Sequence, residues 1–410
     1  MKRLLVFSFV SLLACSLRAV EFQPKTLTED LDDEGSSGAW RNAVKQPSET
    51  LIKEPAYSNG PPLYLSIPIG NDLDNIITGI LDGTAKGAYD ILRLDANNNN
   101  DLSDDAVVTL KPHAYSNMPP DEVWLESEPV QLTVKYFDGT ERKIRGRIHL
   151  MGSRSKGNRE FQYEAAEYVE GKVDLGSGKS LLMGLYDLPG DRRPANGCFN
   201  DIGIDHMRID QNGDGKLDLS EEVPLNRVFQ YDGKLWNLSV DSSASDVSVT
   251  PCNLAVGKIR FSSSFAEGAH LERGTMKIAS KEGYVFICSL SAKDSLPVPE
   301  GDYSAASSEL DVTDASGKKW TTKCSFPSKT RIEPGKETVL TLGAPIKVEP
   351  QISGTLKPGQ KITVLSRQTG ASGEVYDMFV GNGGCIIPSV KITDDKGKGT
   401  VISEGKMGLG

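Results

Sequence analysis

The amino-acid sequence predicts a mostly β protein, in which a loop-rich β domain is followed by one or two β-sandwich modules. Apolar and polar residues alternate along short runs such as 130–136, with the period of a strand that buries one face. Asp-Gly pairs at 138–139 and 232–233 separate such runs, as expected for tight hairpin turns. Helical periodicity is scarce, and residues 72–82 form the best short helical candidate.

The N-terminal residues 1–15 have the pattern of a signal peptide. Two basic residues precede the apolar run 4–14, which is too short to span a bilayer. The sequence LLAC, ending at Cys15, resembles the lipobox of bacterial lipoproteins, and this resemblance implies lipidation of Cys15. Ordinary cleavage after Ser16 or Ala19 is the alternative. Both routes predict a secreted, periplasmic or cell-surface protein.

Composition divides the rest of the chain into a tether and three β segments. Residues 16–62 are polar and lack periodicity, which predicts an extended polar tether. The loop-rich β domain is expected over 63–248, with a further hairpin around 170–171. Strands then recur at short intervals, which predicts a β-sandwich module over 249–345 and a small β module over 346–410.

One short element points to a known type of sandwich. The stretch LPVPEGDY, residues 296–303, resembles the P-x-G-x-Y element of prealbumin-like and carboxypeptidase-regulatory-like β-sandwich modules. The resemblance implies that Tyr303 packs at a strand corner and has a structural role.

The stretch 208–222, RIDQNGDGKLDLSEE, follows the twelve-residue EF-hand calcium loop. Calcium takes six to eight hard oxygen ligands, so a short segment must gather acids and amides around a sharp bend. Gly215 permits that bend, and Leu217 can anchor the loop to the core. The expected ligands are Asp210, Asn212, Asp214, the backbone carbonyl of Lys216, Asp218 and Glu221. The alternative is an Asn-Gly/Asp-Gly turn with solvated acids.

The resemblance covers the loop alone. The segment before Asp210 has a strand-like pattern, and Pro224 limits any following helix to a turn. Such isolated loops resemble those of secreted bacterial proteins and dockerin-type repeats. The resemblance implies that the ion fixes a segment of the fold and does not open helices as in a calcium sensor.

A weaker copy of the same pattern lies earlier in the chain. Residues 89–105 parallel 204–222, with a strand-like lead, an arginine, and acids and asparagines at matching offsets. Asn100 replaces the loop glycine, and Ala106 at position twelve cannot bind an ion. The expected ligands are Asp95, Asn97, Asn99 and Asp101, with Asp104 closing a shorter loop. The alternative is a solvated polar turn.

Two other groups of residues remain open at this stage. Asp191, Asn196 and Asp201 lie in a polar run that either adds ligands to a nearby site or forms an ordinary surface loop. Cys288 and Cys324 lie in strand-like runs and either form a disulfide or remain buried thiols.

Several classes of function lack support in the sequence. The net charge of −10, without a basic patch, argues against nucleic acid as a partner. The four histidines form no HExxH motif, no GxSxG motif is present, and GSGKS at 176–180 lacks the first Walker glycine. Acids are numerous, but no spacing singles out a catalytic pair.

The sequence therefore predicts an exported calcium-binding protein with a structural or binding role and no catalytic activity. Glycan or an envelope protein is the expected partner, and the membrane is contacted only through an N-terminal lipid anchor. An extracellular hydrolase acting on glycan is the alternative. A binding surface would use exposed aromatic residues, for which Trp124 and Trp236 are candidates, although their strand-like runs favour core positions.

Overall fold

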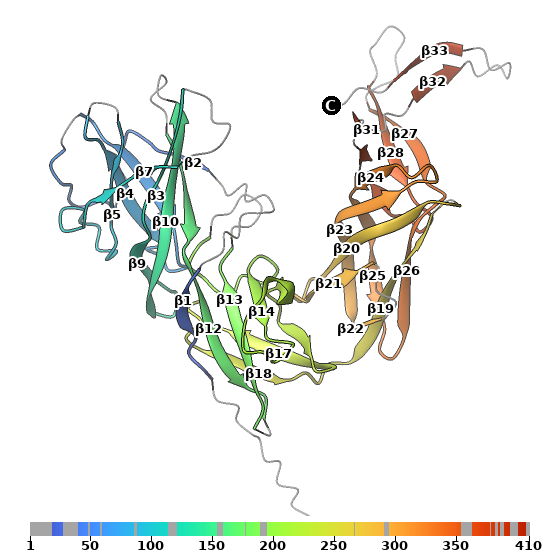
Figure 1. The fold of residues 1–410 in the computed structure, drawn as a ribbon, viewed down its shortest axis with the longest axis horizontal. Coiled ribbons are helices and arrows are strands. Elements are labelled where there is room, and N and C mark those ends of the chain that lie inside the picture. Colours follow the sequence, from blue (N-terminus) through green and yellow to red (C-terminus); the bar gives the residue numbers. More distant parts are fainter. Residues whose placement is uncertain are drawn as a thin grey trace, which may run out of the picture. The chain divides into compact units, whose positions relative to one another are not determined.

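The computed structural model divides the chain into two compact units, Met1–Pro251 and Cys252–Gly410. The boundary predicted at residue 248 therefore falls inside the last strand of the first unit. Strands make up almost all regular structure in both units, as Figure 1 shows, and the mostly β prediction is confirmed. The structure describes residues 19–27, 40–47, 50–57, 60–85, 88–113, 121–153, 159–176, 178–188, 195–265, 267–290, 295–353, 363–377, 379–381, 384–385, 389–393 and 401–406.

The first unit contains four antiparallel sheets. The largest two run in the order β1-β12-β13-β14-β15 and β2-β11-β10-β8-β7, with β9 paired to β10. Their strands are β1 (Gln23–Thr26), β2 (Arg41–Asn42), β7 (Lys111–Pro112), β8 (Glu122–Glu126), β9 (Val130–Lys135), β10 (Glu141–Ser153), β11 (Glu160–Ala165), β12 (Glu167–Asp174), β13 (Ser180–Tyr186), β14 (His206–Ile209) and β15 (Glu222–Pro224). The smaller sheets contain β3 (Leu63–Pro68), β4 (Ile76–Asp82), β5 (Ile91–Leu94) and β6 (Val108–Thr109), and β16 (Val228–Tyr231), β17 (Lys234–Val240) and β18 (Val247–Pro251).

One large apolar cluster contains residues from all four of these sheets. Leu65 of β3, Ile148 of β10, Leu185 of β13 and Trp236 of β17 all belong to one cluster of buried side chains. Each sheet is too small to bury its apolar face alone, so the sheets are stable only together. Trp236 is therefore a core residue. Trp124 is half-buried and packs edge-on against Trp40, with ring centroids 5.3 Å apart.

The helix expected at 72–82 is replaced by strand β4. Residues 76–82 pair with β3 on one side and β5 on the other, and most of β4 is buried. A strand covered on both faces loses the polar–apolar alternation that identifies it in a sequence, and the remaining apolar run is easily taken for a helix.

The hairpin predictions have mixed outcomes. Turns at 138–139 and 232–233 connect β9 to β10 and β16 to β17, as predicted. The predicted turn at 170–171 is wrong, because both residues lie inside β12, and the chain reverses after that strand, where β12 leads into its antiparallel partner β13. Gly171 serves close packing there, since a Cβ atom would lie 2.4 Å from Cδ1 of Phe22.

Part of the segment predicted as a polar tether belongs to the first unit. Strand β1 pairs with β12, and β2 pairs with β11. Phe22 is fully buried, at 0% exposure, and its carbonyl accepts a hydrogen bond of 2.7 Å from Arg142 Nη2. The sequence around Phe22 is mostly polar, so one buried aromatic residue was too weak a pattern to predict this contact.

The second unit consists of a three-stranded sheet, a larger sheet and a hairpin. The small sheet has the order β22-β19-β26, with β19 and β26 parallel, and the large sheet is mainly antiparallel. The strands are β19 (Val256–Ser264), β20 (His270–Ser280), β21 (Val285–Ser289), β22 (Leu296–Pro299), β23 (Gly301–Thr313), β24 (Lys319–Thr322), β25 (Cys324–Ile332), β26 (Glu337–Gly343), β27 (Lys347–Ser353), β28 (Thr363–Thr369), β29 (Val375–Tyr376), β30 (Val380–Gly381) and β31 (Gly384–Cys385). The hairpin joins β32 (Ser389–Thr393) to β33 (Val401–Lys406).

The small module expected over 346–410 shares a sheet with the preceding sandwich-like region. Strand β29 pairs with β25, with Cys324 opposite Tyr376, and β30 pairs with β24. Cys288 of β21 and Cys324 of β25 are both free and buried, so the disulfide alternative is wrong. Burial is the main cause that raises the pKa of the Cys288 thiol to about 12, as expected for a thiol in an apolar core.

Tyr303 has the structural position that the P-x-G-x-Y element implies. Its side chain is fully buried at the start of β23, and its hydroxyl donates a 2.9 Å hydrogen bond to the carbonyl oxygen of Pro299. The bond crosses the turn between β22 and β23, and it therefore fixes the angle at which the chain moves from the small sheet to the large one.

Replacing Tyr303 with phenylalanine should lower the free energy of unfolding of the second unit by about 1 kcal/mol, because the buried carbonyl loses its donor. Urea unfolding, followed by the fluorescence of Trp320 in the same unit, measures this loss. A midpoint equal to that of the wild-type protein would show that the hydroxyl does not stabilise the corner.

Candidate functional site

The strong EF-hand-like loop connects two short strands of the first unit. Strand β14 leads directly into Asp210, and β15 begins after Glu221. A single 3₁₀ turn, η2 (Leu219–Glu221), takes the place of the exiting helix of an EF-hand. The predicted strand-like lead and the predicted limit to one turn are both confirmed. Because antiparallel pairing joins β14 to β15, the sheet holds the two ends of the loop together.

Asp210 organises the first half of this loop. Its Oδ1 accepts hydrogen bonds from the amides of Gly213 and Asp214 at 2.7 and 3.1 Å, and its Oδ2 accepts from Gly215 at 3.0 Å. The side chain is 8% exposed although most of the loop around it is exposed. Gly213 and Gly215 have φ angles of 78° and 80°, and this left-handed backbone directs their amides at the carboxylate.

Glu221 closes the loop from its other end. Its Oε1 accepts from the amides of Gln211 and Asn212 at 2.9 and 3.3 Å, and its Oε2 accepts from Asp218 at 3.3 Å. The carboxylate at position twelve therefore lies over the start of the loop, beside Asp210. This is the position from which a bidentate glutamate binds in an EF-hand loop.

The remaining predicted ligands lie on the exposed part of the turn. The side-chain oxygens of Asn212 and Asp214 accept 2.8 and 2.9 Å bonds from the amides of Asp214 and Lys216. Asp218 precedes the 3₁₀ turn as its capping residue. Leu217 lies against Gly184 of β13, where a Cβ atom would be 2.8 Å from Leu217 Cδ1. Leu217 is half-buried there, so it connects the loop to β13 without being part of the buried apolar core.

The basic residues before the loop contact Glu222, the acid that follows Glu221. Nδ1 of His206 lies 2.6 Å from Glu222 Oε1, and Nε of Arg208 donates a 3.0 Å bond to Oε2. Burial opposes ionisation of Glu222, but these contacts outweigh it and lower its pKa. His206 therefore has a structural contact, as expected for a lone histidine beside a strand.

The earlier loop has the same local design. Strand β5 leads into Asp95, whose Oδ1 and Oδ2 accept 2.8 Å bonds from the amides of Asn99 and Asn100. Asn98 and Asn100 have φ angles of 56° and 64°, so asparagines adopt the left-handed conformation that Gly213 and Gly215 supply in the later loop. Asn99 also accepts from the amide of Asp101 at 2.8 Å.

The closing acid of the earlier loop is Asp105, whereas the sequence pattern had predicted Asp104. Oδ1 of Asp105 accepts a 3.0 Å bond from the amide of Ala96, just as Glu221 accepts from Gln211 at the equivalent position. Asp104 is exposed, and its carboxylate instead accepts a 3.1 Å bond from the side-chain amide of Asn99. Counting four residues on from the buried Leu102, as from Leu217 to Glu221, reaches Ala106, so the spacing in the sequence did not single out Asp105.

The two loops differ in their charged neighbours. Nζ of Lys53 lies 3.1 Å from Asp101 Oδ2, so a lysine partly neutralises the earlier loop. Oδ1 of Asn97 accepts a 3.1 Å hydrogen bond from the amide of Asn99, and Asn97 is exposed. Burial, followed by repulsion from Asp95, raises the pKa of Asp105 to about 6.

Both loops offer oxygen atoms suited to a hard cation, but the acidic side chains are not gathered as they are in an assembled metal site. No group of three or more His, Cys, Asp or Glu side chains within the described ranges has the geometry of a metal site. In the later loop, however, backbone amides fix the carboxylates of Asp210 and Glu221 at the two ends of an EF-hand-like set of oxygen donors, which also includes Asn212 and the carbonyl of Lys216. Asp105 Oδ2 is buried without a hydrogen-bond partner among the described residues.

Asn196 and Asp201 form no part of either loop. Nδ2 of Asn196 donates a 2.8 Å bond to Asp201 Oδ2, and both residues lie beside the buried Asp187 and Asp205. No pattern in the sequence singled out the two buried acids. Asp191 and Cys15 lie outside the described residues, so the predicted lipidation stays a prediction.

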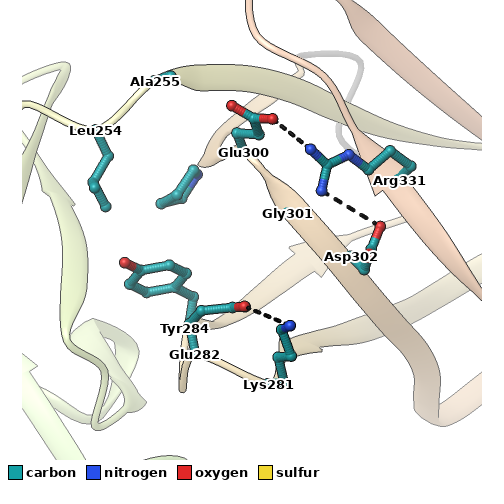
Figure 2. Close-up of a pocket in the computed structure, with 10 residues that line it drawn as sticks. Leu254, Ala255, Lys281, Glu282, Tyr284, Glu300, Gly301, Asp302 and Arg331 are labelled. Atoms are coloured by element: carbon teal, nitrogen blue, oxygen red, sulfur yellow. Dashed lines mark hydrogen bonds and ion pairs between the residues drawn. The ribbon is translucent and has the colours of Figure 1, made fainter.

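A pocket of about 330 Å³ lies in the second unit. Figure 2 shows Arg331 paired with both Glu300 and Asp302 on one side and Glu282 paired with Lys281 on another. Each of these acids thus has a basic partner, in contrast to the unpaired acid and base that glycoside hydrolysis uses. The pocket does not favour the hydrolase alternative, which stays a hypothesis.

Comparisons with protein-family models, with curated proteins and with solved structures gave no match. No helical segment in the described ranges has the length and hydropathy of a membrane span.

Proposed function

We propose that this chain is an exported calcium-binding protein of the cell envelope or extracellular space, with a structural or binding role. The observation that carries the proposal is the fold of residues 210–221. Backbone amides fix the carboxylates of Asp210 and Glu221, at positions one and twelve of the motif, and Glu221 folds back onto the amides of the two residues that follow Asp210. An ordinary turn over residues 212–215 does not explain why Glu221, six residues after Gly215, folds back onto the start of the loop.

The expected effect of calcium is to hold strands together. Residues 210–221 contain four acids and one lysine, so the loop carries a charge of −3 before an ion binds. A divalent cation relieves the repulsion between these carboxylates and fixes β14 and β15 at one edge of their sheet. An ion that binds only the folded protein stabilises it by mass action, and millimolar affinity suffices outside the cell.

The earlier loop is proposed as a second, weaker calcium site. Its ligands would be Asp95, Asn97, Asn99 and Asp105, with Asp105 taking the role first assigned to Asp104. Lys53 beside Asp101 lowers the electrostatic gain from a bound cation, so we expect weaker affinity here than in the later loop.

Calcium titration by calorimetry tests the proposal on the mature protein. The double variant Asp210→Asn, Glu221→Gln should lose the tighter binding heat, with at least a tenfold weaker apparent Kd, because two carboxylate charges are removed while their hydrogen-bond acceptors remain. Asp232→Asn, in an exposed hairpin turn, is the matched control and should bind like the wild type. Equal binding curves for the double variant and the wild type would refute the assignment of this loop.

A further inference from the structure

Two buried carboxylates lie together at the start of β14, at the end of this strand opposite the 210–221 loop. Asp187 follows β13 and is 3% exposed, and Asp205 precedes β14 and is 1% exposed. The amides of Asn196 and Gly197 donate 3.1 and 2.6 Å bonds to the two oxygens of Asp187. Buried acids are rare unless they are paired or bind a metal, so this pair requires a partner.

One oxygen of this pair has no partner among the residues that the structure describes. Oδ2 of Asp205 accepts a 2.8 Å bond from the amide of Asp201, and the backbone amide of Leu188 also favours the charged form of this carboxylate. Oδ1 of Asp205 is buried and finds no hydrogen-bond partner among the described residues. Because Leu188 directly follows Asp187, these interactions hold the carboxylate of Asp205 beside that of Asp187. An ionised oxygen left unpaired in this position destabilises the folded protein.

The electrostatic environment adds to this cost. The charged groups that act most strongly on Asp205 are Asp187 and Asp201, which are both carboxylates. Burial is the main cause that raises the pKa of Asp187 to about 7. Burial and then the charges of Asp187, Asp201 and Asp205 raise the pKa of the nearby Cys198 to about 12. The negative potential in this part of the core therefore favours a cation.

We propose that Asp187 and Asp205 bind a buried calcium ion that is separate from the two loop ions. Oδ1 of Asp205 and the carboxylate of Asp187 supply the charged ligands, while backbone carbonyls and water complete the hard-oxygen shell. Asp201 is a positioning residue, since its amide holds Asp205 and its side chain accepts from Asn196. The ion links the ends of β13 and β14, the second of which leads into the 210–221 loop.

The test counts calcium ions and measures their effect on stability. Equilibrium dialysis against calcium should show that Asp205→Asn binds about one ion fewer per chain than the wild type. In a chelator the same variant should melt no lower than the wild type, because it removes an uncompensated buried charge. In millimolar calcium it should melt lower, because one stabilising ion is lost. Such a reversal in the order of the two melting temperatures, between chelator and calcium, distinguishes a bound cation from a shared proton or a buried water.

Two controls make the result decisive. If Asp205→Asn fails to fold, Asp187→Asn takes its place in the test. This variant retains one acceptor oxygen for its amide donors and should show the same loss of one ion. The loop variant Asp210→Asn, Glu221→Gln should still bind the core ion, so failure of the loop assignment and failure of this proposal are separable. A calcium count unchanged in both single variants, with the same melting order in chelator and calcium, would overturn the proposal.

Discussion

Replacing Phe22 with alanine is expected to lower the free energy of unfolding of the first unit by about 4 kcal/mol. The ring is fully buried against Gly171 of β12. The contact is so close that only glycine, which has no Cβ atom, fits at position 171. Removing the ring leaves a cavity and also loosens β1, whose neighbouring backbone is fixed by Ala244 and Arg142. Urea unfolding followed by tryptophan fluorescence measures the loss, because Trp124 and Trp236 report on this unit.

The matched control is another apolar residue of the segment predicted as a tether. Ile52 is 80% exposed, so Ile52→Ala should change the free energy of unfolding by no more than about 0.5 kcal/mol. If Phe22→Ala had as small an effect as Ile52→Ala, the N-terminal segment would be a tether after all.

Asp210→Ala is expected to cost about 2 kcal/mol of unfolding free energy in the presence of a chelator, before any effect of calcium. Three backbone amides, those of Gly213, Asp214 and Gly215, lose their acceptor at once. In calcium the loss should be larger, because the variant also loses the ion. Thermal and urea unfolding, each in chelator and in calcium, separate the two contributions.

Asp214→Ala provides the comparison for this prediction. Its carboxylate accepts from the exposed Lys216 amide, so we expect a cost below about 1 kcal/mol in chelator. In calcium both variants should lose the stabilisation that the ion gives. Equal stability of Asp210→Ala and the wild type in chelator would contradict the hydrogen-bonded loop described here.

Local features of the fold were predictable because neighbouring residues encode them. The Asp-Gly turn at 232–233 requires left-handed backbone, and both residues adopt it, with φ angles of 50° and 70°. The loop over 210–221 and its strand-like lead were likewise visible in the sequence, since every ligand offset lies within twelve residues. The resemblance of residues 296–303 to the P-x-G-x-Y element likewise implied the structural position of Tyr303, and the whole element lies within eight residues.

Predictions were wrong where contacts between distant parts of the chain decided the structure. Residues 76–82 form a strand because β3 and β5 cover both of its edges, and no local pattern reports that distant pairing. Gly171 lies inside a strand because Phe22 packs across it, and these two residues are far apart in the chain. Turn chemistry alone therefore gave the wrong hairpin.

By itself, the sequence determined that the protein is mostly β and that one twelve-residue segment has the ligand order of a calcium loop. Tertiary structure alone decided that Asp105 and not Asp104 closes the earlier loop, and that Asp187 and Asp205 meet in the core. The physical reason is the range of the interactions. Turns and loop ligands depend on bonds between near neighbours, whereas the direction and burial of a carboxylate depend on which distant strands pack around it.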